Sequence, residues 1–80
     1  MTTTRQALTD SWVNIGSGPL FLETPMLSSI AVHIGDTTPA NDSDAYHGLH
    51  GPDHLSYEGD SQCYVRALND TGVVIYTTSS

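Results

Sequence analysis

The 80 residues carry nine carboxylates against two strong cations, Arg5 and Arg66, which gives a formal net charge of −7 at pH 7. Because phosphate binding needs clustered lysine or arginine, this balance excludes nucleic acids and anionic membrane surfaces as partners. A single core of this size usually supplies only about 3–5 kcal/mol, and Cys63 is the single cysteine, so no disulfide within the chain can add to it. We therefore expect the chain to gain stability by self-association.

The first eleven residues are polar and rich in threonine. We interpret residues 1–11 as an N-terminal arm, either mobile or laid on a neighbouring subunit, and residues 12–80 as a single β-domain. The arm lacks the apolar segment of a signal peptide, and no apolar run approaches the roughly 20 residues of a membrane span. We expect the chain to be made in a cytoplasm.

Short apolar segments separated by turn residues follow the arm. They predict strands at 12–15, 20–24, 28–34, 55–57, 62–68 and 72–78, with a weaker candidate at 46–49. The last two strands are expected to form a hairpin through the turn Asn69–Gly72. No segment keeps an apolar period of 3.6 residues, so no long helix is expected. The pattern predicts an all-β fold, a small antiparallel β-sandwich or barrel of six to seven short strands.

Alternation within the expected strands divides their side chains between two faces. Phe21, Tyr64 and Tyr76 fall on the outer face, where an oligomer contact would cover their rings. Arg66 is interpreted as an interface residue that pairs with a carboxylate across the sheet or across a subunit contact. The alternative for Arg66 is an exposed side chain with a weak surface pair. The expected core consists of Trp12, Val13, Ile15, Leu20, Leu22, Ile30, Val32, Ile34, Leu55, Val65, Ala67, Val73 and Ile75.

The long polar segment 36–54 contains His47, His50 and His54 in the spacing H-x2-H-x3-H. Imidazoles with a nearby carboxylate such as Asp53 are zinc ligands. Glycine and proline between these histidines argue against the helix that would bring the rings together. We expect instead a solvated loop whose histidines cap turns or line a subunit contact, with no bound metal or other cofactor.

No constellation of catalytic residues stands out. Cys63 lies within an expected strand, where a cysteine acts as a small hydrophobe rather than a nucleophile. The segment Asp42-Ser43-Asp44 resembles the beginning of a calcium loop, but the later glycine and glutamate of that motif are missing, so an ordinary turn is expected. We expect no enzymatic activity.

Three segments together carry a family resemblance. They are Trp12-Val13-Asn14-Ile15-Gly16, then Ile30-Ala31-Val32-His33-Ile34-Gly35 followed by Pro39, and finally Cys63-Tyr64-Val65-Arg66-Ala67 before a valine-rich last strand. Residues 12–78 thereby resemble short β-rich virion proteins of tailed bacteriophages. The motifs are structural, and the resemblance implies no active-site residues.

The resemblance implies a virion structural protein that is made in the host cytoplasm. The favoured role is a capsid decoration or cement protein that binds the assembled head as a homo-oligomer, with a trimer favoured. Its partners would be other copies of itself and the major capsid protein or other virion proteins. One alternative is a tail or head-fibre component that contacts the host or other virion proteins. Another is a small metal-binding domain that uses the loop of His47, His50 and His54.

Overall fold

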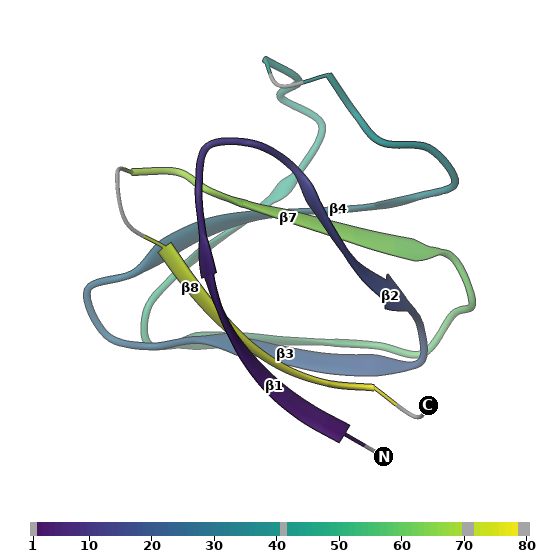
Figure 1. Cartoon of the computed structure of the whole chain (residues 1–80), viewed down its shortest axis with the longest axis horizontal. Coiled ribbons are helices and arrows are strands. Elements are labelled where there is room, and N and C mark those ends of the chain that lie inside the picture. The colour runs from purple at the N-terminus through teal and green to yellow at the C-terminus, as the bar shows by residue number, and fades with distance from the viewer. Residues whose placement is uncertain (1, 41, 70–71, 79–80) are drawn as a thin grey trace.

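The computed structural model describes residues 2–40, 42–69 and 72–78, which form two antiparallel sheets (Figure 1). Within these ranges no helix is long and apolar enough to span a membrane. One sheet has the strand order β1-β8-β3-β6 and the other the order β2-β7-β4-β5. The eight strands of the described residues are β1 (Thr2–Leu8), β2 (Val13–Ser17), β3 (Leu20–Thr24), β4 (Ser29–Gly35), β5 (His47–His50), β6 (Asp53–Tyr57), β7 (Gln62–Ala67) and β8 (Gly72–Thr78).

Consecutive strands lie in opposite sheets, except for β4 and β5, which pair with each other. This arrangement is a double-sheet jelly roll, so the expected all-β sandwich is confirmed, with eight strands rather than six to seven. The expected closing hairpin is wrong, because β7 pairs with β2 and β4 whereas β8 pairs with β1 and β3. Residues 70–71 of its turn lie outside the described residues.

The segment expected to be an arm is a strand of the domain. β1 pairs with β8 along its whole length, and Leu8 at its end is buried. The interpretation of residues 1–11 as an arm is therefore wrong for residues 2–8. Threonine favours strands, but Leu8 is the only large apolar residue of β1, so the segment shows no apolar alternation. Its other inward side chains are polar; Gln6, for example, accepts a hydrogen bond of 3.4 Å from the hydroxyl of Tyr76.

The core lies between the two sheets. Most of the expected core residues are in it; the exceptions are Trp12, which belongs to a second cluster outside this core, and two residues of β8. Val74 is fully buried and Tyr76 packs beside it, whereas Val73 and Ile75, which were expected inside, lie on the opposite side of the strand. The run Val73–Tyr76 is apolar on both faces, so its alternation alone does not choose the inward one. The buried core consists of Leu8, Ile15, Leu20, Leu22, Ile30, Val32, Leu49, Cys63, Val65, Ala67 and Val74.

Candidate interaction site

The outer face of the sheet β2-β7-β4-β5 carries a second, aromatic cluster. Trp12 and Tyr64 are buried on this face, and Tyr46 packs against them. The indole Nε1 of Trp12 donates a hydrogen bond of 2.9 Å to the carbonyl of Ala40. These contacts, made by Ala40 and Tyr46, hold the described residues of segment 36–46 over the sheet. This part of the expected solvated loop is therefore a cover that the chain supplies to its own sheet.

The guanidinium of Arg66 lies against two rings of this cluster. Its Cζ is 5.2 Å from the ring centroid of Trp12 and 5.6 Å from that of Tyr46. Its buried Nε has no hydrogen-bond partner among the described residues. The expected pairing with a carboxylate across the sheet is wrong, since within the described part of the chain Arg66 forms no ion pair. The ring faces take that role, and each such contact contributes about 0.5–2 kcal/mol. Pairing across a subunit contact stays a prediction.

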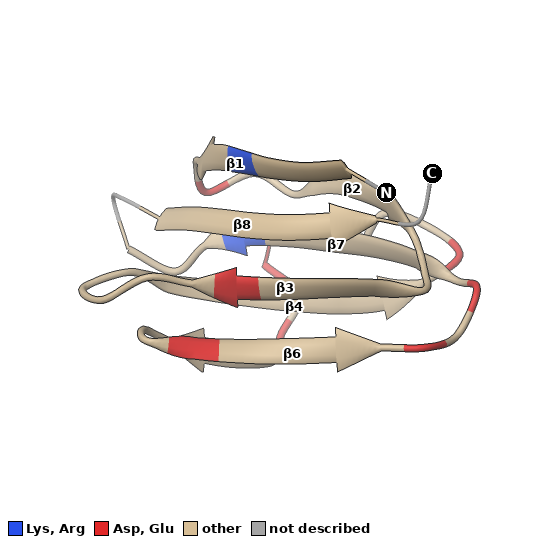
Figure 2. Cartoon of the chain, turned by 90° about the horizontal axis from the view of Figure 1, so that it is seen from below, with Lys and Arg blue, Asp and Glu red and all other residues tan. Residues whose placement is uncertain are grey.

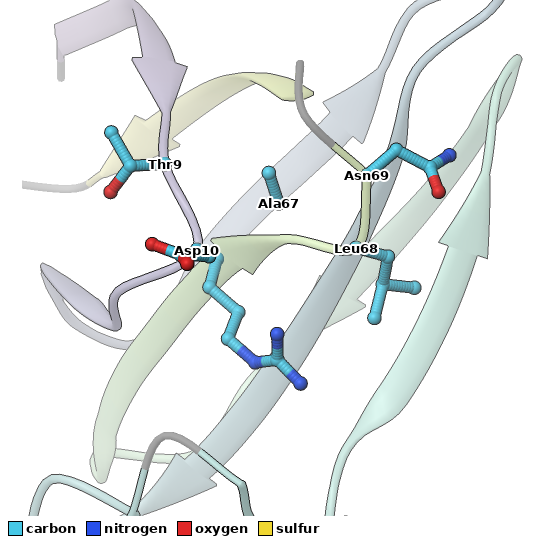
Figure 3. A pocket seen from close by; sticks show the side chains of 6 residues that line it. Thr9, Asp10, Ala67, Leu68 and Asn69 are labelled. Carbon is cyan, nitrogen blue, oxygen red and sulfur yellow. The ribbon is translucent and has the colours of Figure 1, made fainter.

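A hollow of about 490 Å³ opens beside Arg66, where the loop after β1 meets the end of β7. Figure 3 shows Thr9 and Asp10 on that loop, with Leu68 and Asn69 at the end of β7. Among the described residues that line the hollow, Asp10 is the only carboxylate, and the guanidinium of Arg66 is already engaged by aromatic rings. General acid–base chemistry needs a positioned proton donor or acceptor within reach of a reacting group. Among the described residues, the hydroxyl of Thr9 in this lining accepts a hydrogen bond of 3.3 Å from the backbone N–H of Ser11, and the hollow is polar in character.

The outer face of the other sheet, β1-β8-β3-β6, is not covered by any described segment, as Figure 2 shows. Phe21, Val73 and Ile75 lie on this face, and the side chain of Phe21 is 42% exposed. β1 and β8 contain no carboxylate, and Arg5 on β1 is their only charged residue (Figure 2). We call this surface the open face. It is a nearly neutral, partly apolar surface on a strongly acidic chain.

Strand register sets the neighbours of the two large apolar residues on the open face. Ile75 lies between Arg5 and Glu23, which are charges of opposite sign. Phe21 lies beside the ring of His54, with a centroid distance of 5.8 Å. At the end of the open face where β3 begins is a hollow of about 400 Å³, which we call the apolar hollow. Its lining consists of Pro19, Leu20, Phe21, Ser56, Tyr57, Glu58, Thr77 and Thr78.

The turn between β3 and β4 presents two large apolar side chains to solvent. Met26 is 71% exposed and Leu27 is 92% exposed. The backbone N–H of Ser28 donates to the carbonyl of Pro25 at 3.2 Å, and within this turn Leu27 has a φ of 70°. Glycine is usual at the turn position that needs positive φ, and the left-handed conformation costs another residue about 1–2 kcal/mol. Met26 and Leu27 together are called the tip below.

Buried polar residues hold the base of the tip. Thr24 Oγ1 donates to the carbonyl of Val73 at 2.9 Å, and the N–H of Val73 donates to Ser28 Oγ at 2.8 Å. The N–H of Gly51 donates to the carbonyl of Ser28 at 2.7 Å, and a Cβ at Gly51 would collide with the carbonyl of Pro25. Thr24 and Ser28 are themselves buried. The turn is therefore fixed at its base while its two apolar side chains remain in water.

The three histidines of the sequence motif lie on two strands, His47 and His50 on β5 and His54 on β6, and all are exposed. His50 Nδ1 lies 3.0 Å from Ser29 Oγ. Among the described residues, no group of three or more His, Cys, Asp or Glu side chains is placed to hold a metal ion. The geometry therefore does not favour the metal-binding alternative.

The expected interface aromatics divide between the surface and the interior. Phe21 lies on the open face as expected. Tyr64 is only 6% exposed, because the aromatic cluster under segment 36–46 covers it, and Tyr76 packs against the core, so both were wrongly expected at the surface. The tip residues Met26 and Leu27 were missed. The sequence feature that could have identified them is the pair of apolar residues directly after Pro25, at a position where a turn is usually polar.

Cys63 is fully buried, as expected of a small hydrophobe, and burial raises the pKa of its thiol from 9.0 to about 12. We expect a thiol-specific reagent at neutral pH to leave the native protein unmodified and to label it rapidly after unfolding in urea. Above pH 9 the unfolded thiol ionises while the native one stays protonated. The free energy of unfolding should therefore be independent of this group below pH 9 and decrease from there toward pH 12. Rapid labelling of the native protein would contradict the burial.

Comparisons of the chain with protein-family models, with curated proteins and with solved structures found no match. Its function is therefore inferred from the surfaces described above.

Proposed function

We propose that the chain is a non-catalytic structural protein that binds, in many copies, to a symmetric protein shell, as capsid decoration or cement proteins of tailed bacteriophages do. The observation that carries this proposal is the difference between the two outer sheet faces. The face of β2-β7-β4-β5 is covered in part, because segment 36–46 of the same chain packs over Trp12, Tyr64 and Arg66. The open face, with Phe21, Val73 and Ile75, is left without such a cover.

The composition of the open face suits a contact with protein. Removing its apolar area from water favours association by about 25 cal/mol per Å². Among the described residues the strands contain two carboxylates, Glu23 on the open face and Asp53 at the beginning of β6. The other described carboxylates lie in loops (Figure 2). Acidic loops around a partly apolar face favour a partner whose contact surface has a basic rim. Each such contact is small, and many copies on one shell raise the total affinity.

The fold and the sequence motifs agree with this role. Double-sheet jelly rolls are found in viral capsid domains, and also in lectins and cupins. The resemblance of residues 12–78 to phage virion proteins favours the first of these groups. The expected partners are the major capsid protein or other virion proteins, together with further copies of the chain as a homo-oligomer, a trimer being favoured.

Particle binding tests the proposal. The purified chain is mixed with assembled phage heads and sedimented, and it should co-sediment at saturation in a ratio set by the symmetry of the shell. Ile75→Asp should weaken binding about tenfold or more, because it places a charge in an apolar contact. Thr37→Asp, an exposed site on the segment that covers the other sheet, should bind like the unmodified chain. A chain that stays in the supernatant, or equal binding by both variants, would contradict the proposal.

A further inference from the structure

The tip and the apolar hollow lie at opposite ends of β3. The hollow includes Leu20 and Phe21, where β3 begins, and the tip follows Thr24, where it ends. Figure 1 shows the β3–β4 turn at the left end of the sandwich and the start of β3 at the right end. A strand rises about 3.3 Å per residue, so the strand itself separates the two features by roughly 13 Å. A chain therefore cannot place its tip in its own hollow.

Both features are apolar, and one projects from the fold whereas the other is a hollow in it. The tip is convex, consists of two apolar side chains and is held rigidly at its base, so little order is lost when it binds. The hollow is concave, and the rings of Phe21 and Tyr57 and the side chains of Pro19 and Leu20 contribute to its lining. Its volume of about 400 Å³ is in the range of sites that accept small ligands, so a leucine side chain fits.

We propose that the tip of one copy inserts Leu27 into the apolar hollow of the next copy, so that the chains associate head to tail. This inference rests on the proposed role as a multi-copy structural protein and specifies how the copies contact one another. A contact between two different surfaces of identical chains produces a ring if the rotation closes, and a filament otherwise. A closed ring of three copies would be the expected trimer.

The backbone at Leu27 supports a role in binding. A leucine is kept at a φ of 70°, which glycine adopts without strain, and its side chain is 92% exposed. Strained conformations are concentrated at functional sites, since folding alone does not select them.

The charge of −7 on each copy opposes association, so added salt should strengthen the contact by screening this repulsion. Salt should have the opposite effect on binding to a basic partner.

Disulfide cross-linking between separately made variants tests the contact. Met26→Cys keeps Leu27 in place and puts a thiol beside it, while Ser56→Cys puts one on the lining of the hollow. The two variants are mixed at high concentration and oxidised; Cys63 is retained because it is buried. The disulfide between Met26→Cys and Ser56→Cys should form at least tenfold faster than the disulfide between Met26→Cys and Thr37→Cys. Thr37 serves as the control because it is exposed and does not line the hollow. Equal rates would overturn the proposal.

Adding Leu27→Gly to the Met26→Cys variant separates binding from folding. The preferred cross-link to Ser56→Cys should be lost, while the midpoint of thermal unfolding stays equal or rises, because glycine relieves the positive φ. A cross-link that persists in the Leu27→Gly variant would overturn the proposal. A large fall in the unfolding midpoint would also overturn it, because Leu27 would then be a structural residue.

Vesicle binding tests whether the tip contacts lipid instead. If the unmodified chain binds zwitterionic vesicles and the Leu27→Gly variant does not, the tip binds lipid and the proposal is overturned. The assays need no phage particle, so their failure is distinct from failure of particle binding.

Discussion

Val74→Asp is expected to unfold the domain, whereas Ile75→Asp leaves it folded. Val74 is fully buried between the sheets, so its replacement places a carboxylate in the core without a partner. Ile75 is the next residue of the same strand but lies on the open face beside Arg5 and Glu23, where a carboxylate keeps access to water. Both changes carry the same low strand preference of aspartate. The pair therefore isolates burial as the cause.

Circular dichroism during heating and the dispersion of amide signals in NMR spectra measure this difference. Val74→Asp should show no cooperative transition and collapsed amide dispersion. Ile75→Asp should keep a cooperative transition at a somewhat lower temperature. Equal loss of structure in both variants would show that β8 does not present Val74 inward and Ile75 outward. This control also supports the use of Ile75→Asp in the particle assay.

Trp12→Ala is expected to lower the free energy of unfolding by about 3–5 kcal/mol, the usual effect of removing a buried tryptophan. The indole contacts Tyr46 and Arg66 and donates to the carbonyl of Ala40, so its loss also releases segment 36–46 from the sheet. Trp12→Phe keeps a ring and loses chiefly the hydrogen bond, for which about 0.5–1.5 kcal/mol is expected.

Urea titration and limited proteolysis distinguish these outcomes. Protease should cleave Trp12→Ala within 36–46 much faster than Trp12→Phe, which should remain close to the unmodified chain. Equal destabilisation by the two substitutions would mean that the ring contacts contribute nothing beyond the hydrogen bond. Slow cleavage of Trp12→Ala would mean that other contacts hold the cover.

Local sequence patterns were sufficient to predict the fold class and much of the core. Alternating segments of β-branched and aromatic residues, separated by glycine and proline, predict the strands at 20–24, 28–34 and 72–78, and the structure has strands at these places. Cys63, set among alternating apolar residues, was correctly expected to be buried. Such predictions succeed because successive side chains of a strand point to opposite faces, so residues two apart share a face whatever the rest of the fold.

The candidate site depended on contacts between distant residues. The pairing of β8 with β1 and β3 decides which of its faces points inward. The sequence of β8 is compatible with either choice, because this strand has apolar residues on both faces. The placement of β7 and β8 in different sheets follows from the same non-local pairing. These two facts put Val73 and Ile75 on the open face rather than in the core.

What the sequence by itself determined is an acidic, all-β domain with a buried thiol and without a clear catalytic motif. Only the tertiary structure decided that residues 2–8 belong to the sheet, that segment 36–46 covers part of one outer face, and that Leu27 is displayed on a fixed turn. The physical reason is that the alternation of apolar and polar residues along a strand shows only which side chains share a face. Which face is buried depends on the strands and loops that pack against it, and these come from distant parts of the chain.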